Sequence, residues 1–571
     1  MKRFQKVLGS IAAFALSGCA GASGPQWPSS DDASQIAVRP YEPPGPDAQL
    51  MYHILLGEIA GKRGQLSTAL ENYQTAARSS SDPRVTERAV GIALFVQNNT
   101  ATLEMARRWY ALQPANIQAR QVLALALLRN ALVEEAVGHL EAVRNATTKD
   151  GQEGFAIVSA LLGQVDDKQV VFKTMRALRE RQPQSKFALY YYSVAALGVK
   201  DYQQALEGLN AALVRDPKWG PANLLRSRVR IEMGDIDPAL KELAQAVAAA
   251  PKDAVLRTGY ARLLVGAGRL NDARHQFQVL AKQNPKDADN LFALGLLAVE
   301  ARQFGDATTY FMSVLRLGKR VMDVYYELGR LEELRGHYRK AQGWYARINN
   351  DERYLSAQVR IGAMQARLGD FAAMSTHFTN IREDNPQSEV TLYIAEAEIL
   401  REEKRHQGVF DLLSQALERN PENKDLLYAR ALAAEKIDRL DVLEQDLRRL
   451  IEVDPNNGQA LNALGYTLAD RTDRYQEALG YLERAIILLP NDATVLDSMG
   501  WVYFHLSRYE ESLKYLRRAY ELNNDAEIAA HLSEVLWVTG QQDEARKIWR
   551  QAFEKSPTND YLLKVKERFG W

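Results

Sequence analysis

The sequence predicts an all-α protein built as an array of stacked helical hairpins, and three observations lead to this fold class. Prolines recur at intervals of 34 or 35 residues over long stretches of the chain. They stand at Pro183, Pro217, Pro251 and Pro285, and again at Pro386, Pro421, Pro455 and Pro490. Between them, each period holds two stretches with apolar residues at helical spacing, and small residues recur at matching sites. A fixed period of this length indicates a solenoid, in which each hairpin buries its apolar face against its neighbours.

The first residues predict an export signal that ends at a lipid-modified cysteine. A basic start is followed by a mostly apolar segment at residues 7–16, which is too short to span a bilayer. The next residues, Ser17, Gly18 and Cys19, complete a motif that resembles a bacterial lipobox. This resemblance implies cleavage before Cys19, acylation of its sulfur and a further acyl chain on its amine. We therefore predict a lipoprotein signal peptide at 1–18 and a stable anchor at Cys19, because several acyl chains together hold a protein at a membrane.

Cys19 is the only cysteine of the chain, so we expect neither an internal disulfide nor a cysteine-ligated zinc. The alternative is an ordinary secreted protein whose signal peptide happens to contain a cysteine. The next residue is Ala20 and not aspartate, which by analogy with lipoprotein sorting in diderm bacteria favours the outer membrane. Residues 19–48 are rich in Pro, Gly, Ser and Ala and lack a periodic apolar face, so they are predicted to be a disordered tether.

The array itself is predicted at 49–557, with two helices in each period. In one period Leu291 and Leu294 share a helical face, and Ala307 and Phe311 share the face of the following helix. Glycines stand in the first helices, at Gly57, Gly295, Gly329, Gly362, Gly465 and Gly500. A small residue in one helix opposite a large one in the next allows two helix axes to approach closely. The proline that follows ends the second helix and presets the turn into the next hairpin.

This arrangement resembles the tetratricopeptide-repeat family, whose period is 34 residues. The clearest units are 459–490, with Gly465 and Leu482, and 496–524, with Gly500 and Leu516. The resemblance implies a right-handed solenoid of about 14 helical hairpins. Beyond the last hairpin, residues 558–571 are predicted to form a C-terminal capping helix that covers the final exposed groove.

The repeat pattern is weaker in several places. It is poor at 83–114, and the phase slips at 115–183, where residues 145–154 predict an inserted loop. The repeats at 318–352 and 387–421 are degenerate, and we expect the solenoid to bend or loosen there.

The composition argues against nucleic-acid binding. The chain has 72 basic and 72 acidic residues, and removal of the signal peptide takes away Lys2, Arg3 and Lys6, which leaves 69 basic and 72 acidic residues. A nucleic-acid binder usually has a marked basic excess.

No motif predicts catalysis, a metal site or a cofactor, and we expect the chain not to be an enzyme and to have no small-molecule substrate. The eight histidines include no pair at helical metal-binding spacing. The glycine-rich segment from Gly266 to Arg269 lacks the lysine of a phosphate-binding loop and falls where other repeats place their interhelical turn. No nucleophile-elbow motif occurs.

The resemblance also implies that the first helix of each hairpin lines a concave, protein-binding groove. Carried onto this sequence, the candidate groove residues are Tyr190, Arg228, Arg262, Phe292, Tyr326, Arg330, Tyr428, Asn462, Tyr466, Asp497 and Trp501. The three arginines recur at one matching site and form a candidate cationic stripe for an acidic or C-terminal carboxylate segment. The alternative is that they pair with local acids such as Glu232, Glu300 and Glu333.

Lipobox, proline-rich tether, array length and tryptophan-ending tail are together similar to the outer-membrane repeat lipoproteins that partner a carboxyl-terminal processing protease in pseudomonads. This resemblance implies a periplasm-facing adaptor that recruits the serine protease and presents protein substrates, such as peptidoglycan hydrolases, to it. The alternative is a pilotin-like or exopolysaccharide-export lipoprotein, which binds an outer-membrane channel subunit. A third interpretation, a hydrolase or transferase within 115–183, lacks a nucleophile paired with a base.

Overall fold

A computed structural model describes residues 46–147, 151–349 and 352–571, and all regular structure in these ranges is helical. The signal peptide, Cys19 and nearly all of the predicted tether therefore lie outside the described residues. The first described helix, α2, begins at Pro46, three residues before the predicted start of the array. The described helices belong to two compact units, Met1–Pro285 and Lys286–Trp571.

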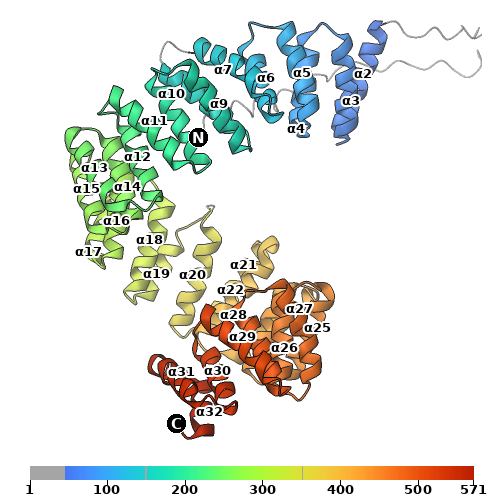
Figure 1. The fold of residues 1–571 in the computed structure, drawn as a ribbon, viewed down its shortest axis with the longest axis vertical. Helices are drawn as coiled ribbons and strands as arrows, with labels where there is room; N and C mark the ends of the chain where they lie inside the picture. Colours follow the sequence, from blue (N-terminus) through green and yellow to red (C-terminus); the bar gives the residue numbers. More distant parts are fainter. Residues whose placement is uncertain (1–45, 148–150, 350–351) are drawn as a thin grey trace, which may run out of the picture. The chain divides into compact units, whose positions relative to one another are not determined.

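The first unit contains the helices α2 to α15 (Figure 1). Their bounds are α2 Pro46–Lys62, α3 Leu66–Ser79, α4 Pro83–Phe95, α5 Asn99–Leu112, α6 Ile117–Arg129, α7 Val133–Thr147, α8 Gly151–Leu162, α9 Lys168–Arg181, α10 Lys186–Gly198, α11 Tyr202–Arg215, α12 Gly220–Glu232, α13 Ile236–Ala249, α14 Ala254–Gly266 and α15 Leu270–Gln283.

The second unit contains α16 to α32 and one short 3-10 helix, η1. Their bounds are α16 Ala288–Glu300, α17 Phe304–Arg316, α18 Val321–Leu334, α19 Tyr338–Tyr345, α20 Tyr354–Arg367, α21 Phe371–Asp384, η1 Pro386–Ser388, α22 Glu389–Glu402, α23 His406–Arg419, α24 Lys424–Lys436, α25 Leu440–Val453, α26 Gly458–Arg471, α27 Tyr475–Leu488, α28 Ala493–His505, α29 Tyr509–Leu522, α30 Ala526–Val538, α31 Gln542–Lys555 and α32 Asp560–Phe569.

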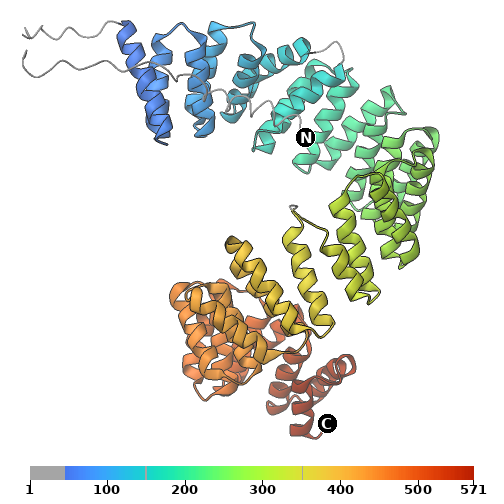
Figure 2. The same cartoon turned by 180° about the vertical axis from the view of Figure 1, so that it is seen from behind.

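Within each unit, consecutive helices lie side by side as antiparallel pairs in both views (Figure 1 and Figure 2). In the described ranges, six such pairs pack as hairpins in the first unit and eight in the second. This result confirms the predicted fold class, a solenoid of helical hairpins.

Glycines of the first helices lie directly against large side chains of the second helices. A Cβ on Gly362 of α20 would come within 2.4 Å of the Phe378 ring of α21, and a Cβ on Gly295 of α16 would meet Phe311 of α17 at the same distance. Phe311 and Phe378 are fully buried. The hairpins therefore close around aromatic side chains that only a glycine opposite them can accommodate.

The periodic prolines stand two residues after the ends of second helices, as Pro251 does after α13 and Pro455 after α25. In several repeats an aspartate or asparagine then caps the next helix, and its side chain accepts a hydrogen bond from the first turn, as for Asp253 and Asn457. The turn inside most of the described hairpins holds a residue with positive φ, although the turn between α26 and α27 does not. Gly268, in the glycine-rich segment between α14 and α15, has φ of 73° and occupies this turn.

The prediction of a loop at 145–154 is wrong, because the described residues at both ends of this segment are helical. Helix α7 continues to Thr147, and α8 begins at Gly151, while residues 148–150 lie outside the described residues. Gly154 lies inside α8, where a Cβ would come within 2.8 Å of the Arg144 carbonyl oxygen of α7. The glycine permits close packing of two helices here and does not mark a turn.

The other weak regions differ from one another. The segment 83–114 forms a complete hairpin of α4 and α5, and 387–421 forms one of α22 and α23. In 318–352, by contrast, the second helix α19 has only 8 residues. Where the phase slips, α8 and α9 both pack against α7 and α10 and have little contact with each other.

Candidate protein-binding surface

The predicted groove residues of the first unit lie on α10, α12 and α14. Tyr190 is half-buried in an aromatic cluster, with its ring 5.0 Å from Trp219 and 5.3 Å from Tyr191, and burial raises the pKa of its hydroxyl. Arg228 is exposed and forms a 3.0 Å ion pair with Glu232, one turn further along the same helix. Arg262 is exposed as well.

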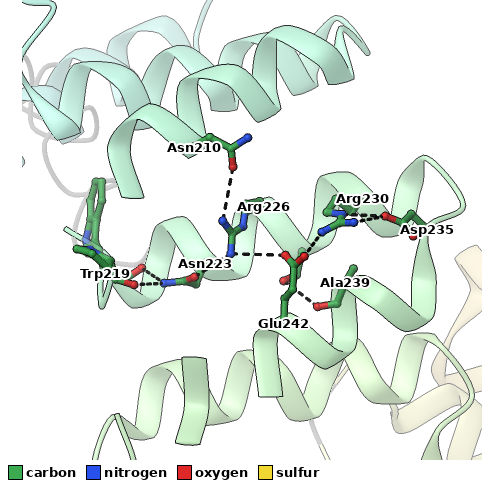
Figure 3. A network of polar contacts seen from close by, with 10 residues as sticks. Asn210, Trp219, Asn223, Arg226, Arg230, Asp235, Ala239 and Glu242 are labelled. Carbon is green, nitrogen blue, oxygen red and sulfur yellow. Dashed lines mark hydrogen bonds and ion pairs between the residues drawn. The ribbon is translucent and has the colours of Figure 1, made fainter. Parts of the chain in front are cut away.

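The arginines that flank Arg228 on α12 have structural partners (Figure 3). Arg226 and Arg230 both reach the carboxylate of Glu242 on α13, and Arg230 also donates to Asp235 at 2.8 Å. These two arginines tie α12 to α13. Arg228 and Arg262 are both exposed to solvent, and Arg228 has the local acidic partner, Glu232, that the alternative interpretation expects.

Three further candidates lie near the start of the second unit. Phe292 is 7% exposed, packs on Phe311 and is covered by the Arg320 guanidinium, so it offers little surface to a partner. Tyr326 is half-buried, with its ring 5.5 Å from Tyr345. Arg330 is exposed and pairs with the buried Glu327 at 2.9 Å, not with Glu333, whose partner is Arg360.

Asn462, Tyr466 and Asp497, from α26 and α28, come together at the wall of a pocket of about 360 Å³. Glu527 of α30 and Tyr561 of α32 also belong to its polar lining. Tyr428 of α24 is half-buried and not part of this lining, and burial raises the pKa of its hydroxyl. We call the lining of this space the C-terminal pocket.

Beneath the C-terminal pocket lies a buried imidazole that links α30 to α28. His531 Nδ1 lies 2.9 Å from a carboxylate oxygen of Asp497, and the two residues are 3% and 4% exposed. The ring of Trp501 stacks on His531 with centroids 4.0 Å apart, while its indole N–H donates to Asp470 at 3.1 Å. Trp501, predicted to face a partner, is thus 7% exposed and orients the histidine.

Hydroxyl and carboxylate groups lie next to the imidazole, with the His531 ring 6.2 Å from the ring of Tyr466 and 5.7 Å from that of Tyr561. Tyr466 donates a 2.6 Å hydrogen bond to Glu527, and its hydroxyl lies 3.5 Å from that of Tyr561. Tyr466 and Tyr561 are 95 residues apart, so these contacts join α26, α30 and α32 across successive hairpins.

The charge states of this cluster follow from burial and pairing. Burial alone lowers the pKa of His531, but the charge of Asp497 and its hydrogen bond outweigh burial, and the pKa of His531 is raised. Burial raises the pKa of Glu527, although the hydrogen bond from Tyr466 opposes the shift. Burial raises the pKa of Tyr561 to about 12. Asp497 therefore favours the protonated form of His531 in the folded protein.

Sequence reasoning found Asn462, Tyr466, Asp497 and Trp501 in this region but missed His531, Glu527 and Tyr561. One signal was present, because His531 follows Asp497 by 34 residues, which is the repeat period. Equivalent sites in adjacent repeats face each other across a solenoid groove.

One nitrogen of the His531 ring has no hydrogen-bond partner in the part of the chain that the structure describes. His531 and Asp497 resemble a base and its orienting acid, but the other ring nitrogen, Nε2, contacts no hydroxyl or thiol of the described residues. Ligand atoms of Asp497, Glu527 and His531 lie within 4.8 Å of one another, a spacing that suits a divalent cation. In the ranges that the structure describes, no helix is both long and apolar enough to cross a bilayer.

Comparisons with known proteins agree with this architecture. Profiles of the tetratricopeptide repeat match residues 196–257 and 230–294, residues 444–493 and residues 493–525. The TPR repeat-containing protein PA4667 of Pseudomonas aeruginosa is 37% identical over 507 residues, which cover 89% of this chain and 86% of that protein.

Solved structures with a similar fold include a chain of the APC/C hetero-tetramer Cut9-Hcn1, with a TM-score of 0.32, 14% identity and coverage of 92% of this chain and 98% of that one. A chain of Naa15/Naa10 bound to HypK-THB has a TM-score of 0.35, 11% identity and coverage of 92% and 96%.

Proposed function

Because the chain belongs to the tetratricopeptide-repeat family, we propose that it is a non-catalytic scaffold that holds protein partners on the surfaces of its first helices. The observation that supports this proposal is the C-terminal pocket, where polar groups of several helices converge. Such a surface suits binding by several side chains at once and does not suit bond cleavage.

We further propose that the mature chain is anchored through Cys19 to the outer membrane and faces the periplasm. The lipobox-like residues before Cys19 and the Pro- and Gly-rich segment after it support this location. A flexible tether raises the effective concentration of anything that the array holds near the membrane.

The proposed partner is a periplasmic carboxyl-terminal processing serine protease, together with protein substrates such as peptidoglycan hydrolases. The chain acts as an adaptor that holds both, so that substrate capture and cleavage occur on one scaffold. The cleaving groups belong to the protease. The exposed Arg228, Arg262 and Arg330 fit acidic segments or C-terminal carboxylates of these partners, because a guanidinium binds a carboxylate with two parallel hydrogen bonds.

Affinity capture from detergent-solubilised cells tests this function. The wild-type chain is expected to retain a serine protease and at least one of its substrates. The triple variant Arg228→Glu, Arg262→Glu and Arg330→Glu is expected to retain less of at least one partner while its helical circular dichroism stays unchanged. Retention of an outer-membrane channel subunit in place of a protease would instead favour an assembly or export role.

A further inference from the structure

The C-terminal pocket is built for a specific chemical group. Its lining comes from the first helices of successive hairpins, including Asn462 of α26, Asp497 of α28 and Glu527 of α30, and it is closed at one end by Tyr561 of α32. A volume of about 360 Å³ accommodates one or two side chains and not a folded domain.

Two acceptor atoms of this lining have no donor. Oδ1 of Asp497 and Oδ1 of Asn462 are buried and contact no hydrogen-bond donor of the described residues. Asp497 uses its other oxygen to bind His531 and is 4% exposed. A buried carboxylate oxygen without a donor is costly in a folded protein, and a ligand that supplies the donor recovers that cost.

The charges of the lining favour a cation. Asp497, Glu527, Glu435 and Asp525 all line the pocket, with Lys436 as the basic residue among the lining residues that the structure describes. Lys436, at the rim, lies 3.6 Å from its neighbour Glu435. Anionic ligands would meet carboxylates without a compensating donor, whereas a cationic N–H donor satisfies both the unpaired oxygens and the charge.

The aromatic residues of the pocket lining also favour a cationic ligand. Tyr466 and Tyr561 both line the space, and a cation near their faces gains a favourable electrostatic interaction. One face of Trp501 is occupied by His531, so this ring supports the pocket from behind.

We propose that the C-terminal pocket binds an ammonium or guanidinium group of a polypeptide partner, with Asp497, Asn462 and Glu527 as acceptors. This inference rests on the proposed scaffold function and names the chemistry of one of its partner segments. The pocket would bind cationic groups, whereas the exposed arginines would bind carboxylates. The chain would therefore offer separate sites for basic and acidic segments of its partners.

Fluorescence anisotropy with short labelled peptides and the full mature chain tests the proposal. Capped alanine peptides that carry lysine or arginine are compared with the neutral isosteres Nε-acetyl-lysine and citrulline, and an uncapped alanine peptide tests the terminal amine. At least one cationic peptide is expected to bind about tenfold or more tightly than its neutral counterpart. Comparison of the lysine, arginine and uncapped peptides identifies whether the bound cation is an ammonium group of lysine, the guanidinium of arginine or the terminal amine.

The variants Asp497→Asn and Glu527→Gln are each expected to weaken binding of that peptide about tenfold. Glu510→Gln, which removes an exposed carboxylate from α29, is the matched control and is expected to bind as the wild type does. Because Asp497→Asn breaks a buried pair and risks unfolding, Glu527→Gln with unchanged circular dichroism is the decisive variant.

Equal binding of charged and neutral peptides, or unchanged binding by folded Glu527→Gln, would overturn the proposal. A third outcome would also overturn it: Zn²⁺ binds stoichiometrically in calorimetry, Asp497→Asn abolishes that binding, and Zn²⁺ prevents the peptide from binding. Asp497, Glu527 and His531 would then form a metal site. Failure of the peptide assay while the wild-type chain still captures a protease would reject this pocket and leave the scaffold function standing.

Discussion

The imidazole of His531 is a buried titratable group of the second unit and lies 2.9 Å from a carboxylate oxygen of Asp497. Its folded pKa is raised, because Asp497, Glu527 and Asp470 outweigh burial. A raised histidine pKa contributes stability that is fully present below the ordinary value of about 6.5 and is lost as pH rises through the folded value. The stability of the C-terminal hairpins is therefore expected to fall as pH rises above about 6.5 and through the folded pKa of His531.

The substitution His531→Asn tests this dependence. The native chain is expected to be more stable than the variant at about pH 6, and the difference in unfolding free energy is expected to shrink toward about pH 9. Urea unfolding followed by circular dichroism at several pH values measures this difference. A constant difference across the range would show that His531 is neutral in the folded protein.

A second residue-scale prediction concerns the buried ion pair of Arg382 and Glu396. The guanidinium lies 2.5 Å from the carboxylate and 4.0 Å from the Tyr393 ring centroid, and the two side chains are 8% and 2% exposed. Arg382→Met is expected to cost about 3–5 kcal/mol, because it leaves a buried carboxylate unpaired. The double variant with Glu396→Leu is expected to recover most of that loss in denaturant unfolding. Similar stability of the single and double variants would contradict this account.

At the scale of helices, the contact between a glycine and a large ring determines how closely each hairpin closes. Gly362→Ala places a methyl group 2.4 Å from the Phe378 ring and is expected to destabilise the second unit by about 1–3 kcal/mol. Gly480→Ala, in the interior of α27 with no atom within 4 Å of its new Cβ, is the matched control. It is expected to stabilise by about 0.5–1 kcal/mol. Equal effects of the two changes in thermal unfolding would remove close packing as the reason for Gly362.

Some features of the helices could be predicted from the sequence and others could not. The hairpins were predictable because prolines, glycines and apolar stripes repeat with one period, and each of these acts locally. Gly154 was misinterpreted as a loop residue, since a glycine needed for helix packing and a glycine needed for a turn look the same in sequence. The distinction depends on Arg144, which lies on the neighbouring helix.

At the scale of the molecule, the groove residues were only partly predictable. Asn462, Tyr466 and Asp497 were found by their register, because one face of each first helix lines the groove. The burial of Phe292 and Trp501 was not predictable, since it depends on Arg320 and His531 from later hairpins. The link from Tyr466 to Tyr561 joins residues 95 apart and has no local signature.

The prediction that the whole molecule is anchored to a membrane depends on the sulfur atom of Cys19. Cys19→Ala removes the sulfur that the acyl chains require, and it is expected to release the chain into the soluble periplasmic fraction while leaving its helicity unchanged. Fractionation followed by immunoblotting measures this release. Full retention of the variant in the outer membrane would reject Cys19 as the anchor.

The central claim, that the array holds a processing protease, is tested most directly by crosslinking in intact cells followed by mass spectrometry. We expect lysine crosslinks from first-helix positions such as Lys424 and Lys436 to a periplasmic serine protease or its substrates. Crosslinks only to an outer-membrane channel subunit, or none from the first helices, would contradict the account.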